Sequence, residues 1–135
     1  MNKEINLLVA FGTDDGKNLN DNHVGKAKVF FIYKISNKGV EFIEKRYNPK
    51  FQEDETLIHG DPAKAAVVSS ILKGIDVIVG KRFGPNIVRM KKKFVCVVVR
   101  VDSIEDALDI VRKNIALIDA EKNKGEGRSH LVLKK

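Results

Sequence analysis

Three stretches of the chain are apolar at nearly every position, so neither of their two faces is suited to water. They are residues 5–11 (INLLVAF), 75–79 (IDVIV) and 94–99 (FVCVVV). Short apolar runs rich in valine and isoleucine are typical of strands that are buried on both faces, as in parallel sheets. We therefore expect these three strands to be parallel and adjacent at the centre of a sheet.

Two further strands are predicted between the first and the second of these runs. Residues 27–36 and 40–47 are separated by the sequence Asn-Lys-Gly, which is typical of a hairpin turn. The second of the two is the more polar, as is usual at the edge of a sheet. The sequence thus predicts a mixed sheet of five strands.

Helices are predicted where apolar positions recur at intervals of three and four residues. One covers residues 61–73 and begins with Asp-Pro, a helix cap followed by a favoured first-turn residue. A short one covers residues 88–93, and a third begins with the capping sequence Ser-x-x-Asp and runs over residues 103–122. The element order β-β-β-α-β-α-β-α indicates an α/β domain with helices flanking the sheet.

Length and composition are those of one ordinary domain. The chain has 135 residues, of which 43% are hydrophobic and 32% charged, enough to bury a core. We expect a single domain over residues 1–122 and a flexible C-terminal tail over residues 123–135, although residues 130–133 also fit an added strand. There is neither a run of 18 apolar residues nor a signal-peptide pattern, so we expect a cytoplasmic protein without membrane contact.

The excess positive charge is local. The formal net charge is +7, and residues 77–101 contain seven basic residues and no acidic one, so the remaining basic residues match the 18 acidic ones. The seven are Lys81, Arg82, Arg89, Lys91, Lys92, Lys93 and Arg100. Next to a glycine-rich turn, such a field favours an anion site. A solvated lysine-rich surface is the other interpretation.

Two histidines are candidate metal ligands. His23 lies in a polar loop after the first strand, and His59 lies just before the helix at residues 61–73. We expect both loops to meet the turn at residues 80–86 where the parallel strands end, the usual ligand crevice of such sheets. Surface histidines without a ligand are the alternative.

Other reactive side chains give weaker signals. Cys96 lies inside a predicted strand and is expected to be a buried, unreactive thiol. Asp14 and Asp15 end the first strand, but Asp76 opens a strand instead of closing it and residues 77–101 contain no acid. We therefore do not expect the carboxylate cluster of a two-metal nuclease. We therefore expect a binding protein and no enzyme.

Several motifs together resemble the dinitrogenase iron-molybdenum cofactor biosynthesis family. They are FGTDDGKNL, HVGKAKVFFIYKI, the HG pair before the first helix, and GIDVIVGKRFGPNI. The resemblance covers residues 5–118 and is most specific at HxGKAxxF and GxxFGPNI. It implies a ribonuclease-H-like three-layer fold with strand order 3-2-1-4-5, in which the second strand is antiparallel to the first.

The resemblance also implies a function. Carriers of this family bind an anionic iron-sulfur or iron-molybdenum cluster, so we expect a non-catalytic carrier of such a cluster, or of its precursor, in metallocofactor assembly. A recipient metalloenzyme would be its partner. The residues implied for the cluster are Lys81, Arg82, Gly84 and Asn86, with His23 and His59 as metal ligands.

Two alternatives stay open. A basic interaction module could bind an acidic protein partner through the same segment. Nucleic acid is the less favoured ligand, because Phe83 and Phe94 are the only aromatic residues of the basic segment and offer no stacking platform. Either a monomer or a homodimer fits the sequence.

Overall fold

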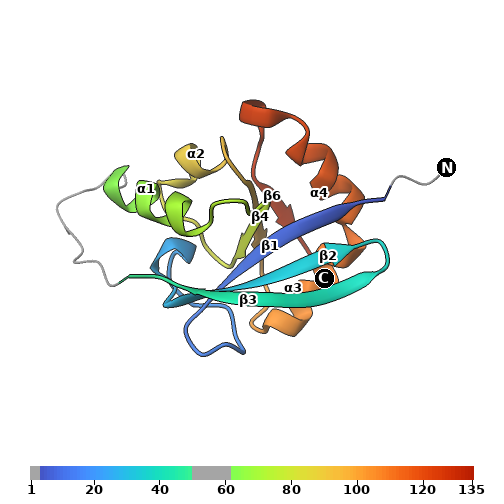
Figure 1. Cartoon of the computed structure of the whole chain (residues 1–135), viewed down its shortest axis with the longest axis horizontal. Helices are drawn as coiled ribbons and strands as arrows, with labels where there is room; N and C mark the ends of the chain where they lie inside the picture. Colours follow the sequence, from blue (N-terminus) through green and yellow to red (C-terminus); the bar gives the residue numbers. More distant parts are fainter. Residues whose placement is uncertain (1–3, 50–61) are drawn as a thin grey trace.

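One six-stranded sheet forms the centre of the molecule (Figure 1). The structure, a computed structural model, describes residues 4–49 and 62–135. The strands are β1 (Asn6–Thr13), β2 (Val29–Ser36), β3 (Gly39–Tyr47), β4 (Val77–Gly80), β5 (Val95–Val99) and β6 (Leu131–Leu133). Their order across the sheet is β3-β2-β1-β4-β5-β6.

The three apolar strands are adjacent and parallel, as the sequence predicts. β1 pairs in parallel with β4, and β4 with β5. Every residue of β4 is buried, as are four of the five residues of β5. The order of the first five strands is the expected 3-2-1-4-5, with β2 antiparallel to both β1 and β3 and with β3 at the edge.

The expected number of strands was one too low. β6 pairs in parallel with β5, with Val97 opposite Leu131 and Val99 opposite Leu133. The segment 123–135, expected to be a flexible tail, therefore contains a strand, preceded by the 3₁₀ helix η2 (Gly125–Gly127). The added-strand interpretation of residues 130–133 is the correct one, because β5 would otherwise leave an apolar edge unpaired.

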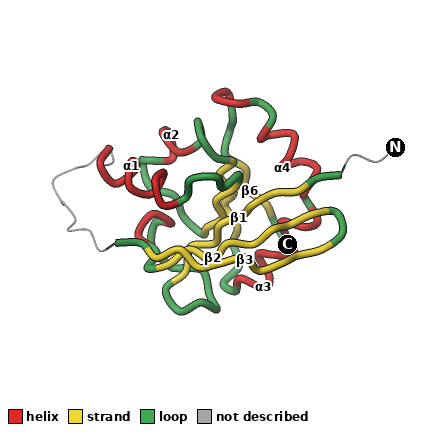
Figure 2. The backbone as a smooth tube through the Cα atoms, viewed as in Figure 1, coloured by secondary structure: helices red, strands yellow, loops and turns green. Residues whose placement is uncertain are grey.

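Helices cover both faces of the sheet and make three layers (Figure 2). On one face α1 (Pro62–Ile71), α2 (Ile87–Met90) and the 3₁₀ helix η1 (Val24–Lys26) pack over a core that includes Val68, Met90 and Val24. On the other face α3 (Ile104–Lys113) and α4 (Ile115–Lys122) cover a second core. Within the described ranges, no helix has the length and apolar character needed to cross a bilayer.

Two helix boundaries differ from expectation. The helix predicted over residues 103–122 is divided at Asn114, whose backbone leaves the helical region (φ −113°, ψ 20°) and whose side-chain amide donates to the Ile110 carbonyl, 2.8 Å away. The division lets α3 and α4 follow the twisted sheet. The short helix is Ile87–Met90, and residues 91–93 form turns.

Two side chains fasten the C-terminal segment to the body of the domain. The guanidinium of Arg128 donates to the carbonyls of Lys92 (2.9 Å) and Lys122 (3.2 and 3.1 Å). The buried carboxylate of Glu121 accepts from the amide of Ser129 (3.0 Å) and from the ammonium of Lys124 (3.1 Å). These bonds hold residues 124–129 in place, so β6 can reach β5.

Replacing Glu121 should loosen this attachment. The amide of Ser129 is the main cause that lowers the pKa of Glu121 below its usual 4.5. The ionised carboxylate therefore stabilises the folded protein in full above about pH 4.5, and this stabilisation is lost as the pH falls through the lowered pKa. We expect Glu121→Gln to reduce the free energy of unfolding by about 1–3 kcal/mol at pH 7. Denaturant titrations at pH 7 and pH 3 would check this, because the difference from the parent should shrink at the lower pH. An equal loss at both values would contradict it.

Cys96 should react slowly with thiol reagents in the native protein. It is fully buried on β5, and burial raises the pKa of its thiol to about 12, so almost no thiolate exists at neutral pH. Labelling with a chromogenic disulfide should be slow in buffer and rapid in denaturant. Rapid labelling of the native protein would show that β5 is not buried as described.

Candidate functional site

The loops that follow β1, β4 and β5 lie at one edge of the sheet and form the candidate site. Two backbone hydrogen bonds join the loop after β1 to the other two loops. The amide of Leu19 donates to the Asp102 carbonyl (2.7 Å), and the amide of Val24 donates to the Arg82 carbonyl (2.9 Å). This edge, formed by the carboxyl ends of parallel strands, is where ligands usually bind in open α/β sheets.

Val24 occupies the space that two glycines leave open at the ends of neighbouring strands. Its side chain is 1% exposed. A Cβ at Gly12, in β1, would lie 2.8 Å from Cγ2 of Val24, and a Cβ at Gly80, the last residue of β4, would lie at the same distance. Both positions therefore need glycine for Val24 to pack there, and Val24 in turn fixes the preceding residue, His23.

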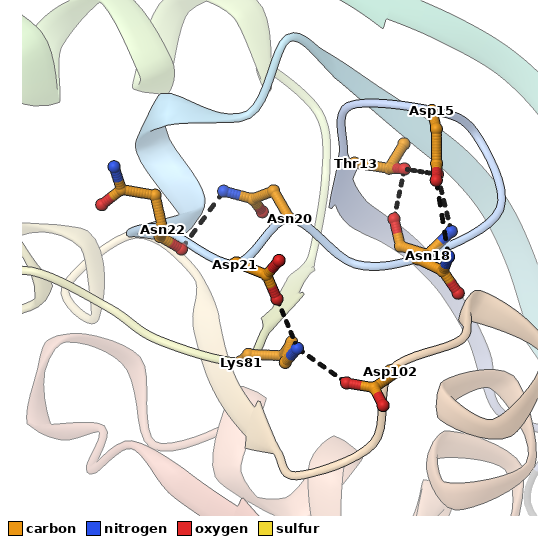
Figure 3. A network of polar contacts seen from close by, with 8 residues as sticks. All are labelled: Thr13, Asp15, Asn18, Asn20, Asp21, Asn22, Lys81 and Asp102. Carbon is orange, nitrogen blue, oxygen red and sulfur yellow. Dashed lines mark hydrogen bonds and ion pairs between the residues drawn. The ribbon is translucent and has the colours of Figure 1, made fainter.

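His23 lies against the turn that follows β4. A Cβ at Gly84 would be only 2.5 Å from its Nδ1 atom, so the imidazole is in close contact with the turn. The side-chain amide of Asn20 donates to the carbonyl of Asn22, 3.2 Å away (Figure 3). It also donates to the carbonyl of His23 (3.0 Å), and the two bonds fix the loop. The structure thus brings His23 and the turn at residues 80–86 together as expected.

Lys81 lies between two carboxylates. Its ammonium is 2.7 Å from Oδ1 of Asp21 and 2.7 Å from Oδ1 of Asp102 (Figure 3). The hydrogen bonds to Asp102 and Asp21 raise the pKa of Lys81, and the bond from Lys81 lowers the pKa of Asp21. Contrary to the expectation for an anion site, the charge of Lys81 is therefore balanced within the protein.

An open depression of about 470 Å³ lies around this lysine. Its lining is mostly acidic and amide side chains: Asp14, Asp15, Asn18, Leu19, Asn20, Asp21, Lys81 and Asp102. With four carboxylates and one ammonium, the depression is net negative. Sequence reasoning missed Asp21 and Asp102, although Asp102 could have been found as the first acid after the strand at residues 94–99.

Two of the four carboxylates stabilise their own loop. Asp14 accepts from the amide of Lys28 (3.0 Å), and Oδ1 of Asp15 accepts from the amides of Lys17 and Asn18 (both 2.8 Å). The amide of Asn18 is the main cause that lowers the pKa of Asp15. In the described part of the chain, no three histidine, cysteine or acidic side chains are grouped so that they could hold a metal ion.

The sequence of residues 6–114 matches the model of the family described as dinitrogenase iron-molybdenum cofactor. This match covers most of the chain. The chain belongs to this family. The resemblance seen in the motifs is thereby confirmed, and a relation to the iron-molybdenum cofactor holds at the level of the family.

A solved structure from Methanocaldococcus jannaschii, named a "putative dinitrogenase", has the same fold. The TM-score is 0.59 at 18% sequence identity, and the match covers 82% of this chain and 91% of the other. At that identity the likeness concerns the fold alone. None of the curated proteins compared with the chain matches it.

The remaining residues implied by the family resemblance are only partly placed. Arg82 is exposed, and Asn86 accepts through Oδ1 from the guanidinium of Arg89, 3.0 Å away. Gly84 contacts His23 as described above. His59 lies outside the described residues, so its predicted place at the site stays a prediction.

The packing of Val24 can be tested at Gly80. We expect Gly80→Ala to lower the free energy of unfolding by about 1–3 kcal/mol, because the new methyl group would overlap Val24. The cost should become much smaller in a Val24→Ala background, where that overlap is removed. Urea titrations of the four proteins in this cycle would measure it.

Gly39 provides the matched control, because nothing lies within 4 Å of a Cβ placed there. Gly39→Ala should be nearly neutral. If Gly80→Ala costs the same with and without Val24, the two residues are not coupled as described.

Proposed function

We propose that this protein is a non-catalytic carrier of an anionic metal-sulfur cluster, of the iron-sulfur or iron-molybdenum type, or of a precursor of one. The cluster would bind where His23 meets the turn at residues 80–86. The observation that carries the proposal is the close contact of the His23 imidazole with Gly84. A histidine is a suitable ligand for iron in such a cluster, and the family relates to an iron-molybdenum cofactor.

The charges around His23 favour the binding of an anion on one side of this histidine. The depression around Lys81 is net negative and would repel an anion, whereas Arg82 is exposed on the neighbouring turn. Arg89 is drawn towards the same turn by its bond to Asn86. An anionic cluster would therefore sit on the α2 side of His23, with Arg82 and Arg89 near its negative charge.

A carrier needs a surface for the protein that receives its cargo. The side chains of Lys92 and Lys93 are exposed in the turns after α2. Basic side chains there would attract an acidic surface and guide its approach. A recipient metalloenzyme with such a surface is the partner that we propose.

Variants of His23 and Arg82 test the proposed site. We expect His23→Ala and Arg82→Ala each to weaken cluster retention about tenfold to a hundredfold, since each removes a ligand or a charged contact. Their melting temperatures should stay close to that of the parent, because surface substitutions usually change stability by no more than about 0.5 kcal/mol. Reconstitution with iron and sulfide without oxygen, followed by gel filtration and metal analysis, would measure retention.

Two matched variants serve as controls. His130→Ala removes an exposed histidine and Arg112→Ala removes an exposed arginine of α3, and neither residue lies in the loops that form the candidate site. Both should retain the cluster like the parent. If the parent binds no cluster, or if the His23 and Arg82 variants retain it equally well, the carrier proposal fails and a basic module for an acidic protein partner takes its place.

A further inference from the structure

The edge strand β3 carries an unusual amount of exposed apolar surface. Val40, Phe42, Ile43 and Tyr47 are 38%, 46%, 44% and 72% exposed. They make up most of the large exposed apolar side chains among the described residues. β3 pairs only with β2 in the described sheet, so one row of its backbone groups faces outward. Such an edge is suited to pairing with another strand.

A β-bulge in β3 decides which side chains share a face. Phe42 is opposite Tyr33 and Glu44 is opposite Ile32, so Ile43 is the additional residue. After the bulge, Lys45 is opposite Phe31. Phe42 and Lys45 consequently lie on one face, although they are three positions apart. The rings of Phe42 and Phe31 are 5.6 Å apart, and the Lys45 ammonium lies 5.2 Å from the centre of the Phe31 ring.

The other face of β3 carries opposite charges at the two ends. Glu41 is opposite Lys34 and Arg46 is opposite Phe30, so both point to the face that α1 covers. The guanidinium of Arg46 reaches the carbonyls of Ile71 (3.0 Å) and Lys73 (2.8 Å) at the end of α1, which confirms its direction. Its Nε also lies 2.8 Å from Oε2 of Glu44 on the same face, so a carboxylate of a second strand would join an existing ion pair.

The side chains of β3 are complementary to themselves about the midpoint between Ile43 and Glu44. Turning a second β3 by 180° about an axis through that midpoint, perpendicular to the sheet, makes an antiparallel pair. It places Val40 opposite Tyr47, Glu41 opposite Arg46, and Phe42 opposite Lys45. Each of these three pairs lies on a single face and is attractive as an apolar contact, an ion pair or a cation–π contact. Ile43 and Glu44 are opposite each other at the centre.

We propose that β3 pairs with β3 of a second copy of this chain, so that one sheet continues through a twofold dimer. The neighbouring registers are less favourable. A shift of one residue would oppose Glu41 and Lys45, which point to different faces, and a shift of two would oppose Glu41 and Glu44, which repel each other. Charges that usually protect a free edge here select one partner and one alignment. The cluster site has no residue in β3, so the dimer does not depend on the proposed function.

Sedimentation equilibrium of the full chain tests the dimer. The parent should be in concentration-dependent equilibrium between monomer and dimer. Glu41→Arg, which replaces two ion pairs by two like-charge pairs, should raise the dissociation constant at least about tenfold. Glu126→Arg makes the same change of charge at an exposed residue far from β3 in the sequence and should leave the constant unchanged. A parent that is monomeric at all concentrations, or a Glu41→Arg protein that dimerises like the parent, would overturn the proposal.

Cysteine cross-linking tests the register. Val40→Cys mixed with Tyr47→Cys should give a disulfide-linked dimer under mild oxidation, because the two positions are opposite. Either variant alone should give little, since its own cysteines would lie far apart in the dimer. Cys96 is buried and provides no competing thiol. Equal cross-linking in the mixture and in the separate variants would show that the proposed register is wrong.

Discussion

The packing of one valine against two glycines organises the functional edge of this protein. Val24 can occupy its position only because Gly12 and Gly80, on adjacent parallel strands, have no side chain. Once it is buried there, its amide bonds to the Arg82 carbonyl. This bond fixes the loop after β1 relative to the turn after β4, and His23 is thereby brought against Gly84.

The two neighbouring cations at this edge have different surroundings. Lys81 extends towards the depression and is balanced by Asp21 and Asp102. Arg82, the next residue along the chain, is exposed, and its charge is a lesser cause, after Lys81, that lowers the pKa of Asp21. The lysine joins three loops, and the arginine is the cation that we propose for the ligand.

Much of the fold follows from the apolar pattern alone. Residues 5–11, 75–79 and 94–99 have no polar face, which requires burial on both sides and so a central parallel arrangement. The sixth strand was harder to predict, because the segment that leads to it is held by Glu121 and Arg128 through contacts that no local pattern shows. The break at Asn114 has the same origin, since an apolar period of three and four continues across it.

The site was predicted less completely than the fold. The meeting of His23 with the turn at residues 80–86 follows from where parallel strands end. The partners of Lys81 did not follow, since Asp21 and Asp102 are far from it in the sequence and approach it only through the order of the strands. Counting charges along the sequence treated Lys81 and Arg82 alike. In the structure Lys81 is paired with two carboxylates, whereas Arg82 is exposed.

Coordination of the cluster by His23 can be measured directly in the electron spin echo spectrum of the reconstituted, reduced cluster, in a chain whose histidines carry ¹⁵N. His59→Ala and His130→Ala would be combined so that His23 is the only histidine left. The account predicts a hyperfine coupling to nitrogen that is typical of a coordinated imidazole. A cluster retained at full occupancy without that coupling would contradict it, because His23 would then not be its ligand.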